Sequence, residues 1–386
     1  MRLAVPGRSM RVMNMRVLSA LAGATILLSA CATTSDYSES DNPADETQSA
    51  YGAFLAARFA GSAQDVTSAS DYFAAALGHA PENAFLADRT FLAATLAGDM
   101  DRSINAARLA VPSTDESGLA RLHLAADAIH DRRGAEARRW LEGGNYGPFN
   151  GLLYAILDGW ALVQLGDHDA ALAASDDMDA PGFAAAFIAL HRALILEQAG
   201  RTEAADSAFR AAMAGASYRR VTVELYGGFL ERAGRSTDAD ILYSAYLSEI
   251  PEDPGIEAAL DRVRAGQRAP RRPSAAQAAS RAVLGPSAAV AAQADMELSI
   301  LYLRLAQRLD PDYAPTLILL GGTLDRMGFS EGALRAYDAV PDGAFSRTAR
   351  IERLWLQARS GDPDGARAGV RRDAGLAILF FPRCNP

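Results

Sequence analysis

The chain has 386 residues, of which 49% are hydrophobic and only 8% aromatic, and its formal net charge is −9. All 38 basic residues are arginine, against 47 acidic residues, and this balance disfavours nucleic acid and anionic surfaces as direct partners. Two cysteines, Cys31 and Cys384, provide neither a disulfide framework nor a metal-ligand spacing. Many alanines with few aromatics favour closely packed helices over β-sheet.

The N-terminal segment has the pattern of an export signal. Residues 16–31 read RVLSALAGATILLSAC, a basic start followed by an apolar run that is too short to cross a bilayer comfortably. The run ends in Leu28-Ser29-Ala30-Cys31, which resembles the lipobox of bacterial lipoproteins. That resemblance implies a signal peptide at 1–30, a diacylglycerol on Cys31 and, since no aspartate follows the cysteine, a periplasm-facing location at the outer membrane. The alternatives are an ordinary signal peptide or an uncleaved anchor.

An acidic stretch follows the cysteine. Residues 31–47 are polar, carry several acids and show no apolar period. Segments of this composition cannot bury enough apolar surface to fold. We therefore expect 31–47 to be a flexible tether between a lipid on Cys31 and the folded part of the chain.

Glycines recur through the remaining chain at a nearly constant interval. Neighbouring glycines of the set are 32 to 37 residues apart, except for one gap of 94 residues. An alanine follows five residues after several of them, as at Ala205 and Ala239, and an aromatic residue follows four residues later, as at Phe209 and Tyr243. A period near 34 residues indicates a helical repeat. The glycines are Gly61, Gly98, Gly134, Gly166, Gly200, Gly234, Gly328 and Gly361.

The clearest repeat spans residues 220–251, RVTVELYGGFLERAGRSTDADILYSAYLSEIP. It divides at Gly234 into two helical halves, and Gly227 and Ala239 are small where two antiparallel helices must approach closely. Tyr243 would fill the gap beside them. The unit resembles a tetratricopeptide repeat (TPR). The resemblance implies an all-α fold, a right-handed α-solenoid of about eight or nine helix-turn-helix units.

The gap of 94 residues divides the array. Residues 266–273 belong to a Pro-, Gly- and Arg-rich stretch that predicts a loop, which gives repeats at 48–265 and at 274–372. After the loop, 275–284 and 295–309 can pair as one more unit, with the turn GPSAA between them. This region resembles TPR lipoproteins of α-proteobacterial type.

The last residues depart from the pattern of a polar capping helix. Residues 373–386 include the apolar run LAILFF and end in PRCNP. We interpret this stretch as a truncated or frame-shifted tail with poor order after about Arg372, and the alternative is an apolar tail that folds into a groove.

The chain carries no pattern typical of catalysis. Glycine-rich phosphate loops, nucleophile elbows and Cys–His pairs are absent from the sequence. His123 and His130 share a helical face with Asp127 between them, but the tighter spacing of a metal motif is lacking, which favours ordinary packing. We predict no enzyme activity, no metal and no cofactor.

The remaining candidate for a functional site is a binding surface. In this repeat the first helix of each unit lines the concave face, and two successive units place mostly apolar residues there, which would suit an amphipathic helix or an extended peptide. In the next unit the same positions become acidic. The alternative is that tight superhelical packing, or the apolar tail, already buries them. The predicted partner-binding residues are Leu153, Ile156, Trp160, Val163, Phe187, Leu190, Leu194, Glu197, Glu224 and Glu231.

These observations together predict a lipid-anchored, periplasmic protein–protein interaction scaffold that binds a protein partner in the concave face of the solenoid. The membrane is contacted through the lipid on Cys31, and nucleic acid is not a partner. Two other hypotheses remain open. One is a glycan- or peptidoglycan-associated protein, or an accessory factor for polysaccharide export, with Trp140 and Trp160 stacking on sugar rings. The other is a cryptic hydrolase, which would need an acid–base pair that the sequence does not reveal.

Overall fold

The structure is a computed structural model that describes residues 49–113, 117–144, 146–176, 184–214, 219–292 and 295–372. Cys31, the predicted signal peptide and tether, and the tail 373–386 lie outside the described residues. The predictions made for those segments therefore stay predictions.

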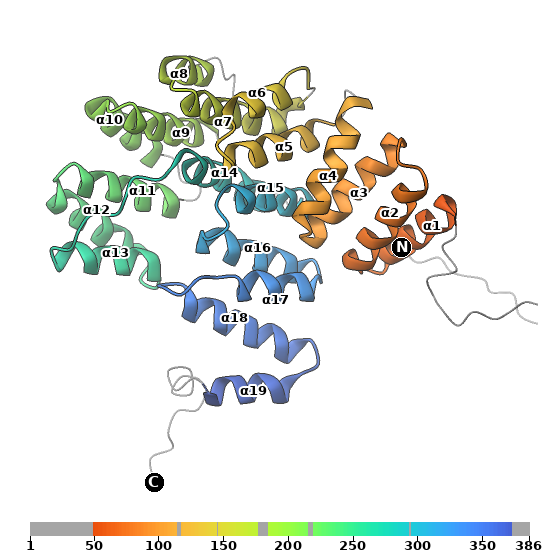
Figure 1. Ribbon diagram of the computed structural model, residues 1–386. Helices are drawn as coiled ribbons and strands as arrows, with labels where there is room; N and C mark the ends of the chain where they lie inside the picture. The colour runs from red at the N-terminus through yellow and green to blue at the C-terminus, as the bar shows by residue number, and fades with distance from the viewer. Residues whose placement is uncertain are drawn as a thin grey trace, which may run out of the picture. The chain divides into compact units, whose positions relative to one another are not determined.

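The described part of the chain folds into nineteen α-helices and contains no strand (Figure 1). A short 3₁₀ helix, η2 (Val111–Ser113), follows the fourth helix. The α-helices are α1 (Ala50–Ser62), α2 (Val66–His79), α3 (Ala84–Ala97), α4 (Met100–Ala110), α5 (Gly118–His130), α6 (Gly134–Leu141), α7 (Gly147–Gln164), α8 (His168–Asp176), α9 (Ala185–Gln198), α10 (Thr202–Met213), α11 (Arg219–Arg232), α12 (Ser236–Glu249), α13 (Pro254–Arg264), α14 (Ala275–Ala292), α15 (Met296–Leu309), α16 (Ala314–Arg326), α17 (Ser330–Asp338), α18 (Ser346–Arg359) and α19 (Pro363–Arg372).

Consecutive helices pack in pairs, and each pair packs on the next. The helices α1 and α2, α3 and α4, and α9 and α10 are among the most closely associated pairs, and α2 also packs on α3. The same arrangement continues from α5 to α12 and from α16 to α19. The fold is therefore an α-helical repeat solenoid, as the glycine period predicts.

Most of the periodic glycines end the first helix of a pair. Six of the eight have a left-handed backbone, for example φ 75° at Gly234 and φ 81° at Gly328. This conformation ends a helix cheaply only when no Cβ is present. Gly61 and Gly134 are different, since Gly61 lies within α1 and Gly134 begins α6. In those two units non-glycine residues, Gln64 and Arg132, take the left-handed position with φ 61° and 62°.

Glycines inside the first helices allow an aromatic ring to pack against the backbone. A Cβ added at Gly227 would lie 2.2 Å from the ring of Tyr243, and one added at Gly321 would lie 2.5 Å from the ring of Tyr337. Both rings are buried, as is the alanine at the close approach of the two helices in the first of these units, Ala239. The small and aromatic residues that recur in the repeat are therefore the residues in direct contact between paired helices.

The region after the loop differs from the prediction in one respect. The predicted turn GPSAA lies inside a single helix, α14, which continues through Pro286. Proline removes one backbone donor from a helix. The hydroxyl of Ser287 donates to the carbonyl of Val283 at 2.8 Å, and the hydroxyl of Ser299 donates to the carbonyl of Ser287 at 2.9 Å. These bonds use backbone carbonyl groups on either side of Pro286. Because α14 is continuous from Ala275 to Ala292, the prediction of a turn at GPSAA was wrong.

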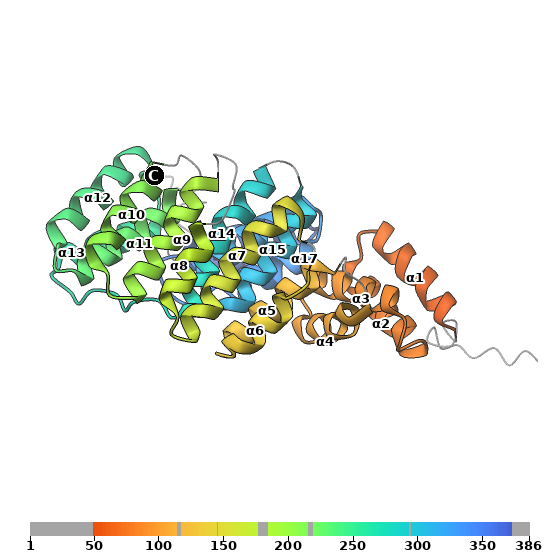
Figure 2. The same cartoon turned by 90° about the horizontal axis from the view of Figure 1, so that it is seen from above.

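The pair α14–α15 does not simply extend the row of repeats. Helix α14 packs against α7 and α9, and α15 packs against α3 and α5, all of which are first helices of their units. Figures 1 and 2 show α14 and α15 running along the inner side of these helices. Two helices of the chain therefore fill most of the face that a solenoid of this kind would leave open.

The loop before α14 is bound to the ends of two first helices. Gln198 donates a 2.6 Å hydrogen bond to the carbonyl of Pro273, and Arg272 donates one of 2.6 Å to the carbonyl of Glu197. Arg232 donates to the carbonyl of Pro270 at 3.4 Å. The loop crosses the C-terminal ends of α9 and α11 and so directs α14 toward the inner face.

Among the helices of the described residues, none has the length and apolar character needed to cross a membrane.

Candidate protein-binding groove

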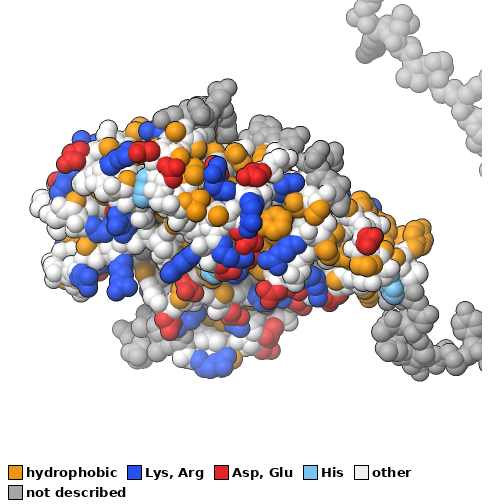
Figure 3. All heavy atoms as spheres, turned by 45° about the horizontal axis from the view of Figure 1, so that its top comes forward, with side chains coloured by type: hydrophobic (Ala, Val, Ile, Leu, Met, Phe, Trp, Pro, Cys, Tyr) orange, Lys and Arg blue, Asp and Glu red, His pale blue; other side chains and the backbone are white. Residues whose placement is uncertain are grey.

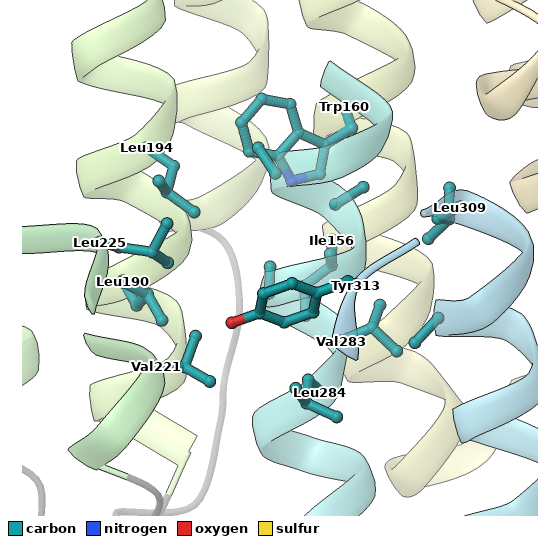
Figure 4. Packing of buried hydrophobic residues seen from close by; sticks show 14 of the residues in the cluster. Ile156, Trp160, Leu190, Leu194, Val221, Leu225, Val283, Leu284, Leu309 and Tyr313 are labelled. Atoms are coloured by element: carbon teal, nitrogen blue, oxygen red, sulfur yellow. The ribbon is translucent and has the colours of Figure 1, made fainter. Parts of the chain in front are cut away.

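The apolar residues predicted to line the concave face are in the core. Trp160, Leu190 and Leu194 are buried together with Val283 and Leu284 of α14 (Figure 4). Leu153, Ile156 and Phe187 are buried as well, and Val163 is partly buried against the same cluster.

The acidic residues predicted there are held by arginines. Glu197 accepts from Arg232 at 2.7 Å. Glu231 accepts two bonds from Arg262, at 2.7 and 3.0 Å, and a third from the hydroxyl of Tyr243 at 2.9 Å.

Glu224 is half-buried and accepts from Arg220 and from Tyr313, both at 2.8 Å. All ten positions therefore face other parts of the chain. Their role as partner contacts stays a prediction, and it would require α14 and its neighbours to leave the inner face.

The aromatic residues named for sugar stacking are not available in this arrangement. Trp160 is fully buried, with its ring edge-on to His191 at a centroid distance of 5.8 Å. Trp140 is partly buried and donates from Nε1 to Glu136 at 3.3 Å. Stacking on a sugar requires an exposed ring face, so neither side chain supports the glycan hypothesis.

The two histidines considered as metal ligands have different surroundings. His123 is buried against Phe91, whereas His130 lies near the carbonyl of Leu309. Asp127 between them is bound by arginines, including Arg308 at 2.6 Å. Within the residues that the structure describes, no group of three or more His, Cys, Asp or Glu side chains is arranged to hold a metal ion.

An open groove remains at the N-terminal end of the inner face, beyond the part of that face that α14 and α15 fill. It is a cavity of about 680 Å³ between α1, α2 and α3, with Glu297 of α15 and Phe329 before α17 at its rim. Its lining consists of Phe54, Ala57, Arg58, Gly61, Ser62, Val66, Ala69, Phe73, Phe85, Arg89, Leu92, Ala93, Leu96, Glu297 and Phe329. We call this the N-terminal groove.

Three phenylalanines form the apolar wall of the N-terminal groove. The ring of Phe54 is 6.0 Å from that of Phe73 in an edge-on contact and 6.0 Å from that of Phe85 in a tilted one. Phe73 is buried, whereas Phe85 is 52% exposed. The inner part of the wall is thus fixed by packing, and its outer ring is free to contact another molecule.

Two arginines stand beside this wall. Arg89 lies over the ring of Phe85, 5.2 Å from its centroid, and is 3.8 Å from Asp88. Burial raises the pKa of the Asp88 carboxyl, which Arg89 opposes. Arg58 is exposed and makes no ion pair with any described residue. The groove therefore combines apolar surface with two guanidinium groups that retain free donors.

Local capping fixes the three helices that form the groove. The side chains of Ser49, Asp65 and Asn83 each accept a backbone N–H in the first turn of α1, α2 and α3. The backbone bond from Ser68 lowers the pKa of Asp65. Gln64 donates to the carbonyl of Met327 at 3.0 Å, so the turn between α1 and α2 is attached to the turn between α16 and α17.

A second cavity, of about 330 Å³, lies between α11, α13 and the loop before α14. Five arginines line it: Arg220, Arg232, Arg262, Arg271 and Arg281. Four of them are already paired with Asp253, Glu197, Glu231 and Asp310. This cavity is therefore a network of internal ion pairs and a weaker candidate for a ligand than the N-terminal groove.

The sequence interpretation did not identify the N-terminal groove, because the first three units match the repeat poorly. A signal was nevertheless present. The first two units place aromatic residues at Tyr51, Phe54, Phe59 and Phe85, in a chain with few aromatics. Such a concentration at one end indicates a surface that packing alone does not explain.

No protein-family model matches the chain, and no curated protein matches it either. Solved structures do match. The structure of Naa15/Naa10 bound to HypK-THB overlaps 83% of this chain at 14% identity and a TM-score of 0.32, and this chain spans 62% of that one.

Two further matches are the P58(IPK) TPR domain and Pseudomonas aeruginosa pilF. The first overlaps 87% of this chain and 99% of its own, at 11% identity and a TM-score of 0.26. The second overlaps 61% of this chain and 95% of its own, at 15% identity and a TM-score of 0.24. Identities and TM-scores this low transfer no function, so the assignment of the fold rests on the helix pairs of the chain itself.

Proposed function

We propose that the chain is a lipid-anchored scaffold at the periplasmic side of the outer membrane, and that it binds a protein partner in the N-terminal groove. The observation that carries this proposal is the contrast along the inner face. Helices α14 and α15 fill most of it, whereas the end formed by α1, α2 and α3 keeps an open, mainly apolar cavity. Open apolar concavities of this size mark binding sites for peptides or helices.

The lining defines the chemistry of the partner. An apolar segment would cover Phe54, Phe85 and Leu92, and an acidic side chain or a carboxyl terminus would pair with Arg58 or Arg89. Arg89 is already held over the ring of Phe85, so little side-chain entropy would be lost when it binds. The partner segment is therefore expected to be apolar and acidic.

A peptide-display selection against the purified full chain tests this proposal. The chain should enrich apolar segments that carry Asp or Glu. The charge-reversed variant Arg58→Glu/Arg89→Glu should enrich apolar segments that carry Lys or Arg instead. The matched control is Arg268→Glu/Arg271→Glu, which makes the same charge change at two exposed arginines of the loop before α14. The control should select the same peptides as the parent.

Two outcomes would show that the N-terminal groove is not the binding site. One is the absence of any enriched class. The other is a selected set that does not change with the charge of residues 58 and 89, because the arginines would then have no part in recognition. Enrichment that the loop variant abolishes and the groove variant retains would place binding elsewhere on the chain.

The lipid anchor is supported by the pattern around Cys31 and is tested separately. In the parent, intact-mass analysis of the membrane fraction should give a chain that begins at Cys31 and carries acyl groups. The variant Cys31→Ser should lack both features. A parent chain without lipid would reject the anchor while leaving the groove to be judged by the peptide selection.

A further inference from the structure

Helix α1 carries a second apolar face besides the one that lines the N-terminal groove. Tyr51, Leu55 and Phe59 follow one another at intervals of four residues, so they form one line along the helix. They are 71%, 48% and 76% exposed. The opposite side of α1 packs against α2 through alanines. Figure 3 shows hydrophobic side chains gathered over the α1–α3 end of the described chain.

This face is a ridge and not a cavity. None of the three side chains lines the N-terminal groove, although their neighbours Phe54 and Arg58 do. An amphipathic protein segment is typically bound with its apolar face in a groove. A convex line of apolar side chains matches instead a soft, planar surface that can deform around it, such as the interfacial layer of a bilayer.

The charge of α1 agrees with such a surface. Residues 50–62 read AYGAFLAARFAGS, with one arginine and no acidic residue, in a chain whose net charge is −9. Arg58 lies between the groove and the ridge and is exposed. An arginine at this position can place its apolar stem along the ridge and its guanidinium among lipid phosphates. Tyr and Phe are also residue types that favour the membrane–water interface.

The position of α1 in the chain supplies the remaining argument. Only seventeen residues separate Cys31 from Ser49, the N-cap of α1. A flexible polar segment of that length spans roughly 23 Å on average. A lipid on Cys31 would keep the ridge at an effective concentration on the order of millimolar at the membrane surface, where even weak interfacial contacts are populated.

From these observations we infer that α1 docks on the bilayer surface through Tyr51, Leu55 and Phe59. The inference rests on the proposed lipid anchor. Docking would hold the folded chain against the membrane and fix where the N-terminal groove opens. Apolar contact provides most of the attraction, so a net anionic membrane is not required.

Spin-label depth measurements test the docking in the lipid-anchored full chain. Single variants Tyr51→Cys, Leu55→Cys and Phe59→Cys, each with Cys384→Ser, are labelled with a nitroxide and reconstituted in phosphatidylethanolamine–phosphatidylglycerol vesicles. The matched control is Ile241→Cys on α12, an apolar residue that is 63% exposed. The ratio of collisions with oxygen to collisions with a water-soluble nickel chelate should be several-fold higher at each ridge position than at 241.

A pair of serine substitutions tests the contribution of the other ridge residues while the label stays at one position. Tyr51→Ser/Leu55→Ser should reduce the ratio at a Phe59→Cys label to the value at 241. Leu109→Ser/Leu165→Ser, which alters two exposed leucines outside α1, should leave it unchanged. Thermal melts followed by circular dichroism verify that each variant keeps the parent fold.

The outcomes distinguish failure of the docking inference from failure of the proposed lipid anchor. If the chain resists carbonate extraction but the ridge labels collide with the nickel chelate as often as the control, docking is wrong while the lipid anchor stands. If the ridge labels are shielded from oxygen and nickel alike, a protein covers α1 and docking is again wrong. If carbonate releases the chain, the anchor fails and the inference fails with it.

Discussion

Gly285 of α14 lies directly against the ring of Phe187 of α9. A Cβ added at Gly285 would be 2.6 Å from Cε1 of Phe187, which is closer than such atoms approach in folded proteins. Phe187 is itself buried. The glycine that resembled a turn signal in the sequence is therefore a packing residue, since it allows α14 to lie in contact with α9 on the inner face of the solenoid.

Substitution of this glycine should destabilise the fold by overpacking. Gly285→Val is expected to lower the free energy of unfolding by about 1–3 kcal/mol, because the buried ring of Phe187 or the backbone of α14 would have to shift to admit the new side chain. Urea unfolding measures the effect. Gly78→Val is the matched control, because Gly78 is helical and nothing lies within 4 Å of an added Cβ. Equal stability of the two variants would show that α14 does not pack on α9 in this way.

The ion pair between Glu231 and Arg262 allows a second test of the packed interior. Glu231→Leu alone should destabilise the chain by about 1–3 kcal/mol, because it leaves the partly buried guanidinium of Arg262 without its partner. The double variant Glu231→Leu/Arg262→Met should recover most of that loss, since both charges are then removed. Denaturant midpoints of the two variants and the parent give the comparison. A double variant as unstable as the single one would exclude this explanation.

Two buried histidines should make stability depend on pH. Burial lowers the pKa of His123 to about 4, and burial together with Arg192 lowers that of His191 to about 3. Because the folded chain binds these protons less readily than the unfolded chain, the stability is present above the unfolded pKa of about 6.5 and is lost as the pH falls toward 4.

The variants His123→Leu and His191→Leu should each reduce this slope. Urea midpoints measured from neutral pH to about pH 4 check it, and the curves of parent and variants should run parallel above pH 7, where neither imidazole gains a proton in either state. A slope that both variants retain would assign the acid sensitivity to carboxylates.

Substitutions at two phenylalanines of the N-terminal groove should affect binding and stability differently. Phe85→Ala is expected to weaken an apolar, acidic peptide selected on the parent by roughly tenfold, while the melting temperature changes little, because the ring is half exposed. Phe73→Ala should lower stability by about 3–5 kcal/mol, because that ring is buried in the wall. Isothermal titration and thermal melts on both variants provide the readouts. Unchanged peptide affinity in Phe85→Ala would remove this ring from the site.

The repeat could be predicted because its signals are local. Gly227, Gly234 and Tyr243 lie within one unit, and their spacing follows from two helices of fixed rise that meet at a left-handed turn. The same reasoning failed at Pro286, because a proline after a glycine ordinarily ends a helix. Here α14 continues through both residues, and its close packing on α9 compensates for the interruption.

The binding site could not be predicted in the same way. Leu153, Trp160 and Leu190 have the spacing expected of a concave face, and they do lie on the inner side of their helices. Whether that side is open depends on α14 and α15, which are more than a hundred residues further along the chain than α7. Helical period describes one helix and its immediate neighbours, and it carries no information about so distant a contact.

The sequence by itself determined the class of fold, the repeat length and the residues at each close approach of paired helices, because short-range sterics decide all three. The tertiary structure decided which part of the inner face is filled and which part remains open. Burial of α14 and α15 removes a large apolar surface from water, and that gain is available only once the preceding helices have formed the face that receives them.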